Sequence, residues 1–192
     1  MIKNPFDVTK AVDYTDDDIY KYWVDLDKED NGFEGLIEPQ SLMPKIIVGS
    51  KGSGKTHVMK YFSYELQKIR CKAEAKSMQE GLANEKFIGV YIRCSGFNSD
   101  KFSGKGVPDE VWATLYSYFW ELWIGERLLD ILIDLRENGT LGEVDEPGIV
   151  TDILKLFLKY ENGIHTFEEL NDYFLRLQKN VDYEVQNFMF AD

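Results

Sequence analysis

Residues 49–56 decide how the rest of the chain is interpreted, and they read Gly49-Ser50-Lys51-Gly52-Ser53-Gly54-Lys55-Thr56. This octapeptide satisfies the phosphate-loop (Walker A) pattern G-x-x-x-x-G-K-[ST] at every fixed position. The β-branched run at residues 45–48 precedes it and predicts a buried strand. Residues 57–79 contain no Gly or Pro and predict a helix, which Gly81 ends. Strand, glycine loop and helix form the context that this motif requires.

The residue types of the loop suit a polyphosphate ligand. Its glycines let the backbone turn tightly and approach a ligand closely, because no Cβ intervenes. The loop amides then point inward as an anion nest, and the start of the helix adds unpaired N–H groups. We expect Lys55, the one candidate catalytic residue, to reach the β- and γ-phosphates, and the Thr56 hydroxyl to bind Mg²⁺. The predicted nucleotide-binding residues are Gly49, Ser50, Lys51, Gly52, Ser53, Gly54, Lys55, Thr56 and the following His57.

Composition limits the class of protein. In 192 residues, 44% hydrophobic and 14% aromatic content indicates a packed globular chain rather than a disordered one. A net charge of -12 argues against a broad electrostatic contact with nucleic acid or anionic lipid. Cys71 and Cys94 are too few for a disulfide framework and indicate free thiols. With no signal-peptide core and no apolar run of bilayer length, we expect a cytoplasmic protein that does not bind membranes.

Further elements follow from local signals. Thr15, followed by three aspartates, predicts the start of a helix that continues to Leu26. Residues 87–92 predict a second strand, parallel to the first through a right-handed crossover. Helices are predicted from Pro108 to about Asn138, from Thr151, and after the capping-box sequence at 166–169.

The predicted fold is therefore an α/β domain of the P-loop NTPase type, with a parallel sheet flanked by helices, a helix-rich second half and an incomplete sheet. Residues 1–43 form an amino-terminal lead-in and helix, and residues 44–192 the partial nucleotide-binding domain. Lys101 and Lys105, in the loop after the second strand, are interpreted as solvated lysines rather than as phosphate or partner contacts.

The helix at residues 111–138 has many large side chains, and two interpretations of it stay open. The first, which we favour, is packing inside the domain, since a short chain needs core residues. The second is a partner surface, because exposed aromatic residues invite association. The residues concerned are Trp112, Leu115, Phe119, Trp120, Leu122 and Trp123.

An ATPase of this class needs a second motif, a hydrophobic strand that ends in an acidic residue. The one candidate ends at Asp134, but helical periodicity indicates an exposed helix residue there. Two predicted strands are also fewer than the roughly five expected of a sheet. We therefore expect that the chain is the amino-terminal part of a larger nucleotide-binding protein, or that a protein partner or self-association completes it.

Several segments together resemble bacterial ATPases of the origin-recognition-like AAA/STAND group. They are Asn4-Pro5-Phe6, Thr15 to Ile19, Pro44 with the first strand, Gly49 to Met59, and Tyr91 to Cys94. The resemblance implies ATP and Mg²⁺ as cofactors and a regulated switch, in some members one that acts in defence against phage or mobile DNA. It places Phe6 beside the adenine, with anchoring of the terminus in the core as the equal alternative.

The chain departs from that group because it lacks the acidic second motif, which puts hydrolysis by this chain alone in doubt. Two functions follow. The first is an ATP-binding domain of an AAA/STAND-like ATPase. The second is a nucleotide-gated protein-interaction module that does not hydrolyse ATP and acts through residues 111–138. A small phosphotransferase is less favoured, because no acceptor-binding motif or Arg-rich lid follows the second strand.

Overall fold

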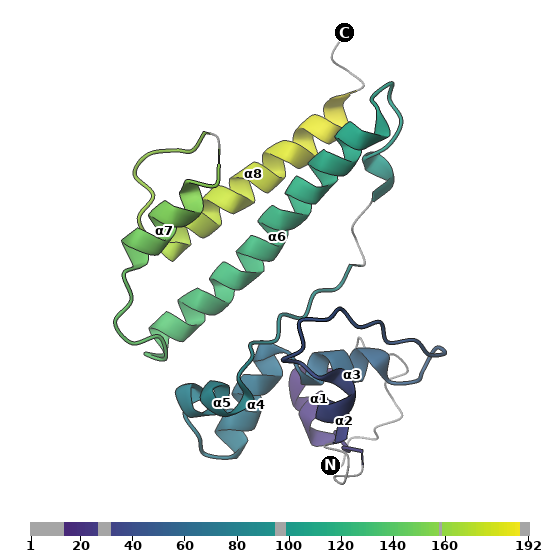
Figure 1. Ribbon diagram of the computed structural model, residues 1–192, viewed down its shortest axis with the longest axis vertical. Coiled ribbons are helices and arrows are strands. Elements are labelled where there is room, and N and C mark those ends of the chain that lie inside the picture. Colours follow the sequence, from purple (N-terminus) through teal and green to yellow (C-terminus); the bar gives the residue numbers. More distant parts are fainter. Residues whose placement is uncertain (1–13, 27–31, 95–98, 158, 189–192) are drawn as a thin grey trace. The chain divides into compact units, whose positions relative to one another are not determined.

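A computed structural model describes residues 14–26, 32–94, 99–157 and 159–188 of the chain. The chain divides into two compact units, Met1–Ile92 and Arg93–Asp192, and each is described by itself. Met1–Ile92 contains the helices α1 (Asp16–Lys21), α2 (Gly32–Ile37), α3 (Lys55–Tyr61), α4 (Tyr64–Ala73) and α5 (Met78–Glu85) (Figure 1). Arg93–Asp192 contains the short 3₁₀ helix η3 (Ser99–Lys101) and the helices α6 (Asp109–Glu137), α7 (Glu146–Leu154) and α8 (Phe167–Asn187). The predicted boundary between residues 43 and 44 was drawn from the motif and stays a prediction.

The predicted parallel sheet is wrong, since the described residues contain helices and no strand. The two segments predicted as strands, 45–48 and 87–92, have no regular secondary structure, and both line one pocket. The hydrogen bonds of a β-sheet need neighbouring strands about 4.8 Å apart. Here α4 binds part of the second segment instead, because the Tyr64 amide donates to Gly89 O at 2.7 Å. Contacts with residues distant in the sequence therefore outweigh the β-propensity of both segments.

The single helix predicted for residues 57–79 is also wrong, because the chain is broken into α3, α4 and α5. Phe62 ends α3, and Ser63 begins α4 with an extended backbone (φ -77°, ψ 158°). A second break precedes α5, where Ser77 and Glu80 form a capping box. Gly81 does not end a helix but lies inside α5, where a Cβ would stand 2.1 Å from Cys71 Sγ.

The helix predicted from Thr15 is confirmed as α1, and its start has the expected chemistry. The Thr15 side chain accepts a hydrogen bond from the Asp18 amide at 3.1 Å, and the Asp18 carboxylate accepts one from the Thr15 hydroxyl. The helix ends at Lys21 rather than at Leu26. Its apolar face is short, and Ile19 is its fully buried residue.

The second unit is built on α6 and α8, which run side by side in opposite directions (Figure 1). The long helix predicted for residues 108–138 and the capped final helix are both confirmed. The α7 helix packs on this pair, and the three helices share one core whose buried members are Leu122, Leu129, Val150, Leu154, Ile164, Phe167, Leu170, Tyr173 and Phe174. Packing is thus confirmed for Leu122, and Trp112 is buried in a second cluster with Phe102 and Val185.

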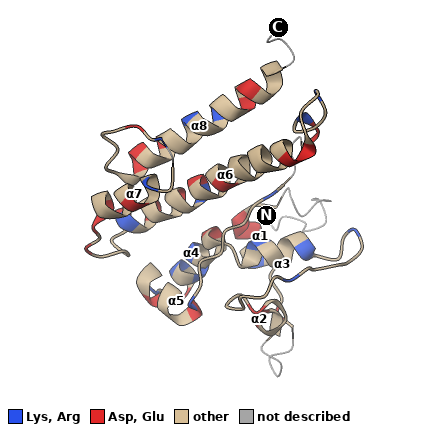
Figure 2. Cartoon of the chain, turned by 45° about the horizontal axis from the view of Figure 1, so that its top comes forward, with Lys and Arg blue, Asp and Glu red and all other residues tan. Residues whose placement is uncertain are grey.

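The two loop lysines are half-buried and bound to α8 rather than freely solvated, which corrects that interpretation. Lys101 forms an ion pair with Asp182 of α8 and lies over the rings of Phe102 and Phe119. Lys105 donates to Val185 O at 2.6 Å. Both lysines bind the segment before α6 to the carboxyl-terminal half of α8. Elsewhere, acidic and basic residues are spread over the helices of both units (Figure 2).

Candidate functional site

The phosphate-loop residues lie between segment 45–48 and α3. Gly52 and Gly54 have positive φ angles of 88° and 83°, whereas Lys51 and Ser53 do not, so φ changes sign at each step. Alternation of this kind is typical of the backbone nests that bind anions. A Cβ at Gly52 or Gly54 would meet nothing within 4 Å, so these positions need glycine for conformation rather than for space.

The Lys55 side chain folds back into the loop. Its ammonium donates to Gly49 O at 2.6 Å, to Ser50 O at 2.8 Å and to Ser53 Oγ at 3.2 Å. These three neutral acceptors use all three of its donors. Phosphate oxygens form stronger, charge-assisted hydrogen bonds to an ammonium group, so they would compete well for the same donors. The arrangement therefore fits a polyphosphate ligand.

Gly49 lies close to the side chains of Ser53 and Lys55 in its own loop. A Cβ there would stand 2.6 Å from Ser53 Oγ and 3.7 Å from Lys55 Nζ. Thr56 follows Lys55 in the first turn of α3 and is half-buried. The structure thus brings the loop, Lys55 and Thr56 together, while Phe6 lies outside the described residues. Their roles towards a nucleotide stay predictions.

His57 belongs to an aromatic cluster that the sequence analysis missed. Its ring stacks on Trp23 at 5.9 Å between centroids and meets Tyr14 edge-on at 6.3 Å. Trp23 in turn stacks on Tyr61 at 3.6 Å and packs on Phe33 at 5.0 Å. Burial lowers the pKa of His57, and the Lys60 charge adds to this, against a hydrogen bond with the Ile19 backbone. The cluster holds α1 and α2 against α3, directly after the phosphate loop.

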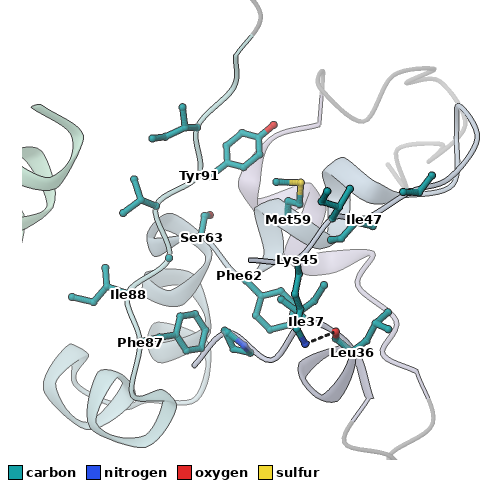
Figure 3. Close-up of a pocket in the computed structure, with 16 residues that line it drawn as sticks. Leu36, Ile37, Lys45, Ile47, Met59, Phe62, Ser63, Phe87, Ile88 and Tyr91 are labelled. Carbon is teal, nitrogen blue, oxygen red and sulfur yellow. Dashed lines mark hydrogen bonds between the residues drawn. The ribbon is translucent and has the colours of Figure 1, made fainter. Parts of the chain in front are cut away.

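An apolar pocket of about 850 Å³ lies beside the loop (Figure 3). Ile46, Ile47 and Val48, which lead into the phosphate loop, form one wall, and residues 87–92 form the opposite one. Met59 and Phe62 of the segment after the loop also line it, as do Leu36, Ile37 and Pro39. Its lining is mostly aliphatic and aromatic, and its lysine, Lys45, forms an ion pair with Glu38 at 2.5 Å, so the pocket differs chemically from the loop.

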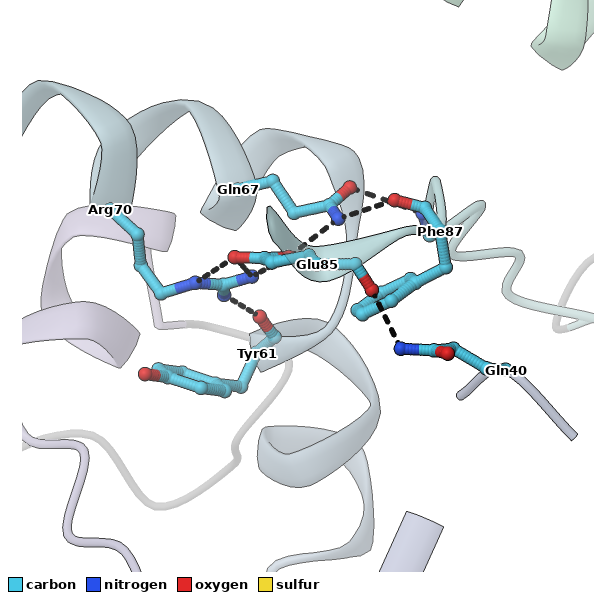
Figure 4. Close-up of polar contacts among 7 residues, drawn as sticks. Gln40, Tyr61, Gln67, Arg70, Glu85 and Phe87 are labelled. Carbon is cyan, nitrogen blue, oxygen red and sulfur yellow. Dashed lines mark hydrogen bonds and ion pairs between the residues drawn. The ribbon is translucent and has the colours of Figure 1, made fainter. Parts of the chain in front are cut away.

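A polar network holds the second of these walls (Figure 4). Arg70 Nη2 lies 2.9 Å from both carboxylate oxygens of Glu85 and Arg70 also donates to Tyr61 O. Gln67 donates to Phe87 O at 3.0 Å and to Glu85 at 2.7 Å, and accepts from the Gly89 amide at 3.1 Å. The network thus binds α4, α5 and segment 87–89 to one another. In the sequence, the polar residues Gln67 and Arg70 within α4 were the signal that could have indicated this network.

Other candidate features have plain outcomes. Asp134 lies within α6, so the prediction of a helical residue is confirmed, but the prediction that it is exposed is wrong, because the residue is half-buried. Cys71 and Cys94 are free, as expected. In the part of the chain that the structure describes, no three His, Cys, Asp or Glu residues gather as a metal site. No helix among those residues has the length and apolarity needed to cross a bilayer.

Comparisons with known proteins complete the description of the site. Neither the curated proteins nor the solved structures contain a match to this chain. A family model described as ORC-CDC6-like matches residues 4–192, which include the phosphate loop, the aromatic cluster and every helix that the structure describes. Because the match covers nearly the whole chain, this protein belongs to the ORC-CDC6-like family, which is related to AAA-type ATPases.

Proposed function

We propose that the chain is an ATP- and Mg²⁺-binding domain of an AAA/STAND-like ATPase that acts as a regulatory or defence-related switch. One observation carries the proposal. The Lys55 ammonium lies inside a complete phosphate-loop sequence, on Gly49 O and Ser50 O, in a chain that belongs to the ORC-CDC6-like family. A motif match, a compatible loop conformation and the family thus support the same ligand.

Each residue of the loop has a role in this proposal. The amides of residues 52–54 bind phosphate oxygens, Lys55 neutralises charge on the β- and γ-phosphates, and Thr56 ligates Mg²⁺. His57 supports the loop through the ring of Trp23, and Phe6 lies near the base. If hydrolysis occurs, water attacks the γ-phosphate in line, and acidic residues from further sequence or a partner orient it.

Two lysines of the same loop provide the test. Lys55→Ala removes the ammonium group that lies inside the loop, whereas Lys51→Ala removes an exposed side chain and keeps the backbone amide. We expect Lys55→Ala to weaken binding of ATP with Mg²⁺ by about 30-fold, roughly 2 kcal/mol, and Lys51→Ala by less than about threefold. Isothermal titration calorimetry measures both. Equal affinity of wild type and Lys55→Ala would refute the proposal.

A second candidate function is a nucleotide-gated interaction module that binds ATP without hydrolysing it. The exposed aliphatic side chains of α6 favour it, since Ile124 is 39% and Leu128 45% exposed. Release of ADP after addition of ATP and Mg²⁺ separates the two functions. Turnover that Lys55→Ala abolishes supports the ATPase, and ATP binding without turnover supports the module.

A further inference from the structure

The apolar pocket of the first unit lies between two uncoiled segments, 45–48 and 87–92 (Figure 3). Along the first segment, exposure alternates as it does along a strand. Ile46 and Val48 are 88% and 87% exposed, whereas Ile47 between them is 39% exposed. Among these described residues, none has a positive φ angle. Both walls of the pocket are therefore extended segments that are not paired with a strand in the described chain.

Most backbone groups of the two walls have no hydrogen-bond partner. Within the described ranges, the N–H and C=O groups of residues 46–48 form no hydrogen bond. On the second wall, Phe87 O and both backbone groups of Gly89 bind α4. Successive residues of an extended chain point their backbone groups in opposite directions, so those of Ile88 and Val90 point away from α4. These groups are also unpaired among the described residues.

The unpaired backbone groups determine which kind of ligand suits the pocket. A purely apolar occupant, such as an acyl chain, would fill the volume of about 850 Å³ but would bury N–H and C=O groups without partners, which opposes binding. A helix uses its own backbone groups internally, so it has the same defect. An extended strand offers N–H and C=O groups along both edges and apolar side chains on its faces. It therefore suits both the lining and the backbone of the walls.

We propose that segments 45–48 and 87–92 bind between them an extended strand of about five residues, rich in β-branched apolar side chains, from another protein. The strand pairs with both walls, whereas the described residues by themselves form no sheet. A second copy of this chain is a poorer source, because its two β-rich segments already form walls and two copies with a net charge of -12 each repel one another. The proposal goes beyond the ATP site and does not rest on it.

Three labelled and capped peptides with the sequence Lys-Val-Thr-Val-Thr-Val-Lys serve as probes. The parent peptide keeps all its amides. One derivative is N-methylated at the valines, which blocks one edge, and the other at the threonines, which blocks the opposite edge. We expect the parent to bind at least tenfold more tightly than either derivative, because a strand between two walls uses both edges. Fluorescence anisotropy without nucleotide measures the affinities.

The two derivatives separate this arrangement from others. Equal affinity of all three peptides would show that side chains alone fill the pocket, as an acyl chain would. Loss of affinity in only one derivative would show that the strand is added outside one wall rather than between the two. Either result overturns the proposal.

Amide hydrogen exchange tests the pairing on the protein itself. With saturating parent peptide, we expect the amides of Ile88, Val90 and alternate residues of 46–48 to exchange at least tenfold more slowly than without it. Amides of residues 142–144, in the other unit, serve as the control and should not change. Binding of the parent without protection of either wall would contradict strand pairing.

Ile46→Asp tests the apolar contact. Because Ile46 is exposed, the variant should fold, as circular dichroism will show, but bind the parent peptide at least tenfold more weakly. Leu42→Asp makes the same kind of change at a fully exposed residue outside the pocket and should bind as wild type does. The same affinity in both variants would remove Ile46 from the site and refute the assignment.

Two further measurements identify the source of the strand and its relation to nucleotide. If the parent peptide does not bind at 1 mM, or if light scattering shows a dimer that the parent dissociates, a strand of another protein is not the occupant. Lys55→Ala should bind the parent normally, so failure of the ATP site is distinguished from failure of the pocket.

Discussion

Gly89 lies directly against the carbonyl group of Phe62, so closely that a Cβ at Gly89 would stand 1.7 Å from Phe62 O. The adjacent hydrogen bond, from the Tyr64 amide to Gly89 O at 2.7 Å, joins the same two segments. This contact occurs where α3 ends and α4 begins. It explains why a stretch without Gly or Pro is not one continuous helix.

Gly89→Ala should therefore destabilise the protein. The added methyl group cannot avoid a backbone atom by a rotamer change, so we expect the free energy of unfolding to fall by about 3 kcal/mol. Ile88→Ala, at a neighbouring residue that is 43% exposed, should cost about 1 kcal/mol. Urea denaturation followed by tryptophan fluorescence compares the two. Identical midpoints for Gly89→Ala and wild type would show that the contact is not tight in solution.

The ion pair between Arg70 and Glu85 should contribute more to stability than a surface pair. Their side chains are only 11% and 27% exposed, and removing one partner leaves a charge poorly solvated. We expect Arg70→Met to cost about 3 kcal/mol in urea denaturation. Arg176→Met removes a pair with Glu161 whose side chains are 52% and 61% exposed, and should cost less than about 1 kcal/mol. A larger loss in Arg176→Met than in Arg70→Met would contradict this account.

The junction of α6, α7 and α8 should make stability depend on pH. Arg136 donates to Glu146 at 2.7 Å and to Glu168 Oε2 at 3.0 Å, and its guanidinium group lowers the pKa of Glu168. A carboxylate with a depressed pKa stabilises the fold above its unfolded pKa of about 4.3, and this stabilisation is lost as the pH falls through the folded value.

The melting temperature of Glu168→Gln should therefore differ most from that of wild type at pH 7. The difference should shrink as the pH falls below about 4, because wild-type Glu168 is then neutral as well. Thermal unfolding between pH 7 and pH 3 measures it. The effect is small, since the Glu168 side chain is 45% exposed and salt screens the pair. A difference that stays constant with pH would show that Glu168 does not act through its charge.

Thr56 should make ATP binding depend on Mg²⁺. Thr56→Ala removes the proposed oxygen ligand, whereas Thr56→Ser keeps a hydroxyl group on the same helix. We expect Mg²⁺ to strengthen ATP binding about tenfold in wild type and in Thr56→Ser, and less than about twofold in Thr56→Ala. Titration of ATP with Mg²⁺ and with EDTA gives the ratios. The same ratio in all three proteins would exclude Thr56 as a ligand.

Local signals predicted the starts of α1, α6 and α8, but the helix predicted from Thr151 begins at Glu146 instead. Thr15 and Thr166 were expected to cap helices, and both accept the expected backbone amide. Such caps need only the next three residues, so neighbouring sequence determines them. The extent of α6 was predicted for the same reason, since its apolar residues repeat over many turns.

Sequence patterns did not predict the contacts between residues that are far apart in the chain. The stack of Trp23 on Tyr61 joins residues 38 positions apart, and Lys101 reaches Asp182 across 81. No periodicity within either segment indicates such a pairing. The two β-rich segments were misassigned for a related reason, since propensity describes a residue's preference but not whether a neighbouring strand is there to pair with it.

By itself the sequence determined the phosphate-loop motif, the capped helices and the acidic balance of charge, because each depends on residue types at short, fixed spacings. The tertiary structure decided that Lys55 folds into its own loop, that the helix after it breaks at Phe62, and that segments 45–48 and 87–92 face each other across a pocket. These features arise where segments far apart in the chain meet, and there packing and burial outweigh local preference.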